Sequence, residues 1–140
     1  MSDLYDRDFY AWSHEQATLL RAGKLSAADI AHIAEEIETL GRSEKRELVS
    51  RLVVLLQHRL KWQFHPSHRG RSWQLSIDNA QHAITEHLAD NPSLKSKLAD
   101  AMESAYYTAR RQAAIETGIE LDALPVQCPW TFEQAMQDTP

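Results

Sequence analysis

The chain has 140 residues, 43% of them hydrophobic and 25% charged, a composition that fits one globular domain with a substantial core and excludes a wholly disordered chain. Its 15 basic and 20 acidic residues give a formal net charge of −5, which is unfavourable for a dedicated DNA-binding protein. The single cysteine excludes an internal disulfide and a cysteine-rich zinc module.

No segment of the sequence predicts secretion or insertion into a membrane. The N-terminal stretch MSDLYDRD is acidic and lacks the apolar centre of a signal peptide. The longest apolar run, residues 52–56, is far shorter than a membrane span. We therefore expect a cytoplasmic protein with no membrane partner.

Two helices are predicted before residue 42, because glycines interrupt two runs of apolar residues at helical spacing. The first helix ends at Gly23 and has an apolar face of five residues: Tyr5, Phe9, Trp12, Leu19 and Leu20. Ser26 is the expected N-cap of the second helix, and Gly41 is expected to end it. The apolar face of this second helix consists of Ile30, Ile33, Ile37 and Leu40.

A third helix is predicted over residues 44–64, with Ser43 as its N-cap. Its apolar residues cover nearly half of the circumference, so we expect it to be the central helix. Arg59 falls inside this apolar arc, where an unpaired guanidinium would be costly. Two explanations are open: the side chain extends to solvent near the helix end, or it pairs with an acidic residue of a facing helix or a partner chain.

The second half of the chain predicts two further long helices and a short one. The fourth helix has an apolar face of Trp73, Ile77, Ala80, Ile84 and Leu88. Asn91 and Pro92 predict the start of a fifth helix, which ends at Gly118, and Thr131 with Gln134 predicts a capping box for a short last helix. The predicted fold is all-α: a single-domain helical bundle, residues 1–140, of about five main helices plus a short C-terminal helix.

Several motifs follow one another along the chain: YDRDFYAW, EEIETLGRSEKRE, LKWQF, SWQLSI, ETG and CPW. In this order and spacing they resemble the bacterial family known as domain of unknown function 29, and the resemblance covers nearly the whole chain. It implies an all-α fold in a bacterium and implies no activity. Arg59 departs from the family pattern, which has a leucine before LKW.

Residues 58–73, HRLKWQFHPSHRGRSW, combine three histidines, four basic side chains and three aromatic ones; we call this segment the elbow. Residues 42–71 hold eight Lys/Arg and two Glu, a local charge of +6. Such a segment can bind nucleic acid, with Lys61, Arg69 and Arg71 as the candidate contacts. The interpretation we favour is a connection between two antiparallel helices. It places Trp62 and Trp73 in the core near each other, Arg69 and Arg71 in solvent, and Lys61 away from the apolar arc.

Asp29, His32 and Glu36 are candidate metal ligands, because their i, i+3, i+7 spacing puts them on one side of a helix. The Glu-x-x-His motif of di-metal bundles does not occur in the sequence. Solvated helix faces are the interpretation that we favour for these residues. We therefore expect no cofactor, and keep a metal-dependent enzyme on the second and third helices as an alternative.

No catalytic motif is present: the sequence contains no Gly-x-Ser-x-Gly and no Cys-x-x-Cys. Cys128 is expected to be a small buried hydrophobic residue. The favoured function is therefore a non-catalytic, cytoplasmic interaction or regulatory protein, with a protein partner and self-association as one form of it. A protein that contacts RNA or DNA through the elbow is the first alternative.

Overall fold

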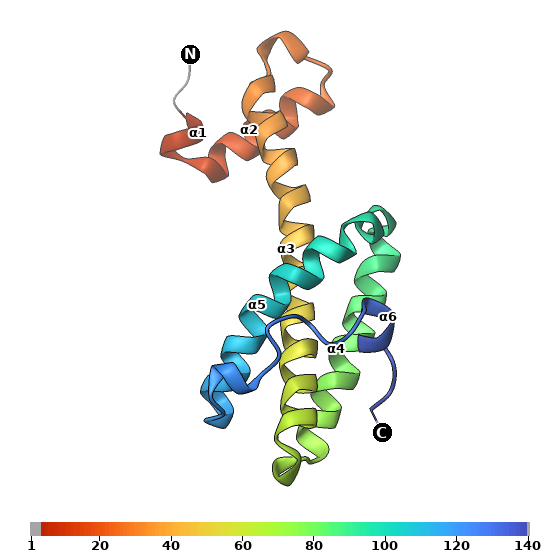
Figure 1. Ribbon diagram of the computed structural model, residues 1–140. Helices are drawn as coiled ribbons and strands as arrows, with labels where there is room; N and C mark the ends of the chain where they lie inside the picture. The colour runs from red at the N-terminus through yellow and green to blue at the C-terminus, as the bar shows by residue number, and fades with distance from the viewer. Residues whose placement is uncertain (1–3, 140) are drawn as a thin grey trace. The chain divides into compact units, whose positions relative to one another are not determined.

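The computed structural model describes residues 4–139, and every regular element in this range is a helix (Figure 1). The α-helices are α1 (Leu4–Arg7), α2 (Phe9–Arg21), α3 (Ile30–Phe64), α4 (Arg71–Asp90), α5 (Leu98–Thr117) and α6 (Phe132–Ala135). Short 3₁₀ segments cover Leu25–Ala27, Pro66–His68, Pro92–Lys97 and Leu121–Ala123. The predicted all-α class is confirmed. No described helix combines the length and the apolar character needed to cross a membrane.

The chain forms two compact units: an N-terminal unit up to residue 43 and a C-terminal unit from residue 44 onward. The boundary falls inside α3, which contributes its first part to one unit and its second part to the other. The first three letters of the acidic N-terminal stretch lie outside the described residues. Folding of the whole chain as a single domain stays a prediction.

The core of the C-terminal unit is built on the second part of α3. Five leucines of this helix are fully buried: Leu48, Leu52, Leu55, Leu56 and Leu60. They pack with Ile77 and Ile84 of α4, which runs back beside α3, and with Ala105 and Ala109 of α5 (Figure 1). Because alanine side chains are small, the backbone of α5 can approach the leucines closely. The expectation that this part of the chain is the central helix holds.

The second and third predicted helices are in fact one, because Gly41 does not end a helix. Gly41 and Ser43 both lie inside α3, and the hydroxyl of Ser43 donates to the carbonyl oxygen of Thr39 at 3.0 Å instead of capping a new helix. A glycine inside a helix costs only about 1 kcal/mol. Burial of the leucines that follow outweighs this cost. Ser26 is likewise not the N-cap of α3, since Asp29 precedes its first residue and accepts from the His32 amide at 3.5 Å.

Two of the other predicted helix ends are confirmed and one is wrong. Gly118 ends α5 with φ 76°, and Thr131 and Gln134 form the predicted capping box. Asn91 does not cap α5, because a 3₁₀ segment comes first and α5 begins only at Leu98. The side-chain amide of Asn91 donates instead to the carbonyl oxygen of His87, which precedes it in the chain, at 3.1 Å.

Arg59 is only 8% exposed, so it does not extend to solvent, and within the chain its partners are backbone carbonyl groups instead of a carboxylate of a facing helix. Its Nε donates to the carbonyl oxygen of Ala135 at 2.7 Å, and its Nη2 donates to that of Gln137. Gln81 of α4 donates to the same two oxygens, at 3.1 and 2.8 Å. Burial lowers the pKa of the guanidinium, and the charge of Asp138 opposes that shift. Arg59 therefore fastens the segment that follows α6 to the bundle, by binding backbone carbonyl groups.

Replacement of Gly41 and of Gly118 by alanine should change the free energy of unfolding in opposite directions. The φ of Gly41 is not positive and no atom lies within 4 Å of an added Cβ, so Gly41→Ala should raise the free energy of unfolding by about 1 kcal/mol. Gly118→Ala should lower it by about 1–2 kcal/mol, because alanine is strained at positive φ. Urea unfolding of both variants at one protein concentration measures the two changes. Equal signs would contradict this description of α3.

Replacing Arg59 should destabilise the C-terminal unit. Arg59→Met keeps the apolar stem but removes the charged hydrogen bonds to the C-terminal carbonyls, at a cost of about 1.5–3 kcal/mol. Arg51→Met is the matched control, since Arg51 is exposed and pairs only with Glu47 one turn away, a contact worth about 0.5 kcal/mol or less. Urea unfolding compares the two variants, and equal losses would refute the assigned role.

Candidate functional site

Large apolar side chains on the surface are concentrated in the N-terminal unit. Seven of the twelve exposed ones among the described residues lie there: Phe9, Tyr10, Leu20, Leu25, Ile30, Ile37 and Leu40. Trp12 is the one large apolar side chain of this unit that is buried within the described range. Where such side chains form a contiguous patch, they mark an interaction site.

The first part of α3 carries the most regular portion of this surface. Ile30 is 53% exposed and Ile37 is 63% exposed, and the exposed Ala34 and Gly41 lie between and after them at helical spacing. We call these four residues the isoleucine stripe. Leu40 flanks the stripe and is 67% exposed. The face that the sequence marks as apolar is thus present on the helix, and in the described part of the N-terminal unit it is exposed except at Ile33, which is half-buried.

A polar network holds α2 against the start of α3. The indole of Trp12 donates to Asp29 Oδ2 at 3.1 Å, and Nδ1 of His32 lies 2.7 Å from the same oxygen. The amide of Asp29 donates to the side-chain oxygen of Gln16 at 2.7 Å. Since Trp12 and Gln16 are the buried residues of α2, this network sets the position of the stripe relative to α2.

Tyr5 of α1 joins the same network through His32 and Glu36. Its ring stacks on the imidazole of His32 with centroids 3.9 Å apart, and its hydroxyl donates to Glu36. This hydrogen bond is the main cause that raises the pKa of Tyr5 to about 12. The hydrogen bond between Asp29 and His32 lowers the pKa of Asp29 and raises that of His32.

These contacts place the three residues predicted as metal ligands. Asp29 and His32 are brought together, whereas the carboxylate of Glu36 accepts from Tyr5. In the described part of the chain, these three are not among the side chains whose ligand atoms gather closely enough to hold an ion. Metal binding by them stays an untested alternative, and the contacts give each residue a structural role.

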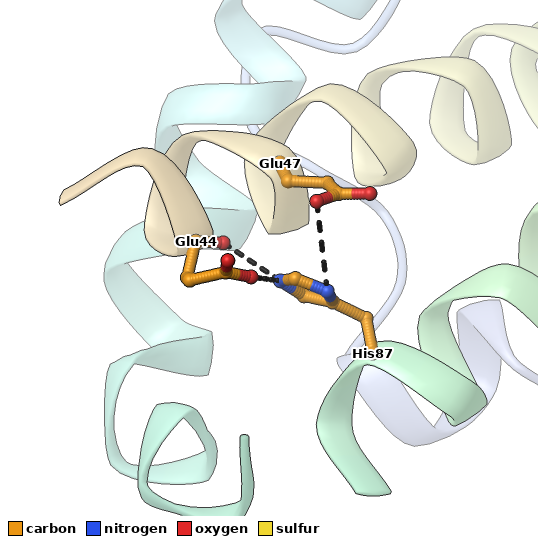
Figure 2. A group of neighbouring side chains, drawn as sticks. All are labelled: Glu44, Glu47 and His87. Carbon is orange, nitrogen blue, oxygen red and sulfur yellow. Dashed lines mark hydrogen bonds and ion pairs between the residues drawn. The ribbon is translucent and has the colours of Figure 1, made fainter. Parts of the chain in front are cut away.

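A different group of ligand-type side chains comes together in the C-terminal unit, between α3 and α4 (Figure 2). Atoms of Glu44, Glu47 and His87 lie within 4.8 Å of one another. Nε2 of the buried His87 donates to the carbonyl oxygen of Glu44 at 2.7 Å, and Nδ1 lies 3.9 Å from the carboxylate of Glu47. Figure 2 shows the imidazole between the two glutamates, which approach different ring nitrogens. The arrangement therefore suits a histidine that links two helices better than three ligands converging on one ion.

The basic side chains of the elbow have different surroundings. Lys61 is only 7% exposed, and its ammonium pairs with Glu116 of α5 at 2.8 Å and lies 5.7 Å from the ring centre of Trp73. Lys61 is expected to point away from the apolar arc, and it is nevertheless buried, because α5 supplies a carboxylate for its ammonium. Arg69 and Arg71 are exposed, as predicted.

The two tryptophans of the elbow are partly buried, which agrees with the prediction in the main: Trp62 packs against the core with its indole nitrogen fully buried, and Trp73 is partly exposed. Arg69 covers the face of Trp62 at 5.2 Å and donates to its carbonyl oxygen at 2.5 Å. Trp73 lies beside Lys61 and, at 6.3 Å, beside His65. Each indole thus has a cation of the same chain near its ring.

A cavity of about 560 Å³ lies between α5 and the loop that follows it, lined by Tyr106, Arg110 and Cys128 among others. Its buried polar groups are already bonded: Tyr106 donates to the carbonyl oxygen of Pro125 at 2.6 Å, and Arg110 donates to those of Leu121 and Leu124. Burial raises the pKa of the Cys128 thiol, which makes it a poor nucleophile at neutral pH. These groups hold the loop in place and do not form a catalytic set.

Fold and surface together define a small all-α protein with an apolar face in its N-terminal unit. The model of the family described as Domain of unknown function DUF29 matches residues 4–139, and the chain belongs to this family, as its motifs indicate. Neither a curated protein nor a solved structure matches the chain.

The pair of Asp29 and His32 predicts how stability changes with pH. Because its pKa is raised in the folded chain, His32 contributes stability below about pH 6.5 that is lost as the pH rises. The pKa of Asp29 is lowered, so its contribution is present above about pH 4 and is lost as the pH falls. His32→Gln should therefore lower the free energy of unfolding most near pH 5, and less above pH ~7.

Unfolding of the wild type and of His32→Gln across this pH range measures the difference. An Asp29→Asn background is the control, because the His32→Gln change should lose its pH dependence once the carboxylate is gone. A difference that stays constant from pH 5 to pH 8 would disprove the coupling.

Proposed function

We propose that this protein is a non-catalytic interaction or regulatory protein of the bacterial cytoplasm, and that it associates with a second copy of itself through the N-terminal unit. The observation that carries the proposal is the exposure of Ile30, Ile37 and Leu40 on one side of a regular helix. Covering half-exposed aliphatic side chains of this size contributes roughly 1 kcal/mol each. In a two-fold interface every such contribution counts twice.

The small core of the N-terminal unit supports association. Ordering each residue costs about 1–2 kcal/mol of backbone entropy, and apolar burial must offset this cost. Within the described residues of this unit, only Trp12 provides a buried large apolar side chain. A second copy would supply the missing cover, whereas the C-terminal unit already has a closed core of leucine, isoleucine and alanine.

The contacts of the elbow favour a structural role over nucleic-acid binding. Lys61 is engaged by Glu116, and Arg69 is held over Trp62. A nucleic-acid interface needs cations free to contact phosphate, and the net charge of −5 opposes it further. Of the three candidate contacts, Arg71 is the one for which the described part of the chain provides no such partner.

The proposal predicts that the average molar mass of the protein in solution rises with its concentration. Sedimentation equilibrium should show the wild type moving from 16.0 kDa toward twice that mass as its concentration rises. Ile37→Lys should remain at 16.0 kDa, because it places a charge in the apolar surface. Ile115→Lys is the control, since Ile115 is an exposed apolar residue of the C-terminal unit.

A wild type that stays at 16.0 kDa up to about 1 mM would overturn the proposal. At that concentration, even an association with a free energy of only about −4 kcal/mol is detected. Dissociation by Ile115→Lys with association intact in Ile37→Lys would overturn the proposal as well. In the first case the apolar surface would have to be covered within the chain or by another protein.

A further inference from the structure

We infer that two copies pair antiparallel along the isoleucine stripe, an inference that rests on the proposed self-association. Ile30, Ala34, Ile37 and Gly41 are separated by four, three and four residues, so the spacing reads the same from either end. An antiparallel second copy, related by a two-fold axis between residues 35 and 36, therefore matches all four positions at once. The interface is isologous, as closed dimers require.

Large and small residues alternate along the stripe. The two-fold axis brings each large residue of one copy opposite a small residue of the other. Antiparallel pairing places Ile30 opposite Gly41 of the partner subunit and Ile37 opposite Ala34 of the partner subunit. Each large side chain thus faces a small one, which lets two helix backbones approach closely. Parallel pairing would instead set isoleucine against isoleucine and leave a gap at glycine against glycine.

The surroundings of Gly41 are open enough for this arrangement. No atom lies within 4 Å of the place where a Cβ would be, so a side chain of the partner can occupy the space. The φ of Gly41 is not positive, and the helix therefore does not need a glycine for its own conformation. A contact with the partner subunit at this position explains why the helix contains a glycine, a residue with low helix propensity.

Four charged residues near the stripe project away from its centre. Asp29 and Arg42 each lie about 110° from it at about 100° per residue, and within the chain Asp29 bonds to His32 and Arg42 pairs with Glu38. Glu35 and Glu36 project more than 100° away from the centre of the stripe at about 100° per residue. The carboxylate of Glu36 is in addition bonded to Tyr5. Neither glutamate therefore enters the contact.

An exchange of the large and small residues tests the orientation. Gly41→Ile should weaken self-association at least tenfold, because two isoleucines then meet at each end. Ile30→Ala combined with Gly41→Ile in one chain should bring the dissociation constant back to within about threefold of the wild type, since alanine now faces isoleucine. In a parallel pair residue 41 meets residue 41, so the double variant would not recover. Circular dichroism checks that both variants keep their helix, which Gly41→Ile should favour.

The outcomes separate this inference from the proposal on which it rests. Dissociation by Ile37→Lys without recovery in the double variant would overturn the antiparallel arrangement and leave self-association standing. A wild type that does not associate would remove both. Recovery in the double variant, with Gly41→Ile dissociated, establishes the orientation.

Discussion

The leucine face on the second part of α3 is the constraint on which the rest of the fold depends. Leu48, Leu52, Leu55, Leu56 and Leu60 are fully buried, and α4 and α5 both pack against them. Because this face is wide, two helices and the C-terminal segment can share it. Buried cations complete the arrangement: Lys61 pairs with α5, and Arg59 binds the carbonyl group of the last residue of α6 and that of Gln137.

The same helix has no such cover in its first part. Between Ile30 and Arg42 its apolar residues form a narrow stripe with small residues between the large ones, and the stripe is exposed. A polar network around Asp29 and His32 holds α2 beside the helix but does not bury the stripe. One continuous helix thus builds a closed core with one half and carries exposed apolar side chains on the other, which we propose to be the surface for association.

Local signals in the sequence predict the class and many helix ends, because they act over a few residues. Gly118 ends α5 through its positive φ, and Thr131 with Gln134 forms a capping box within three residues. Gly41 is misleading for the same reason: a glycine signals a helix end locally, but burial of leucines further along keeps α3 intact. The exposed stripe itself is visible in the sequence as an apolar face, but the sequence does not show that nothing in its own unit covers it.

The partners of charged side chains could not be predicted, since they come from distant parts of the chain. The partners of Arg59 follow it by more than seventy residues, and Lys61 finds Glu116 on α5. Glu44, Glu47 and His87 likewise meet only because α4 turns back beside α3. No spacing rule connects such residues. Their juxtaposition follows from the packing of the leucine face.

Hydrogen–deuterium exchange at two protein concentrations, one on each side of the dimerisation midpoint, tests the central claim most directly. If the stripe is covered by a second copy, amides of residues 30–42 will exchange more slowly at the higher concentration. Amides of residues 52–60, in the closed core, will exchange at the same rate at both concentrations. Identical exchange of residues 30–42 at the two concentrations, in a sample whose mass changes, would contradict the claim.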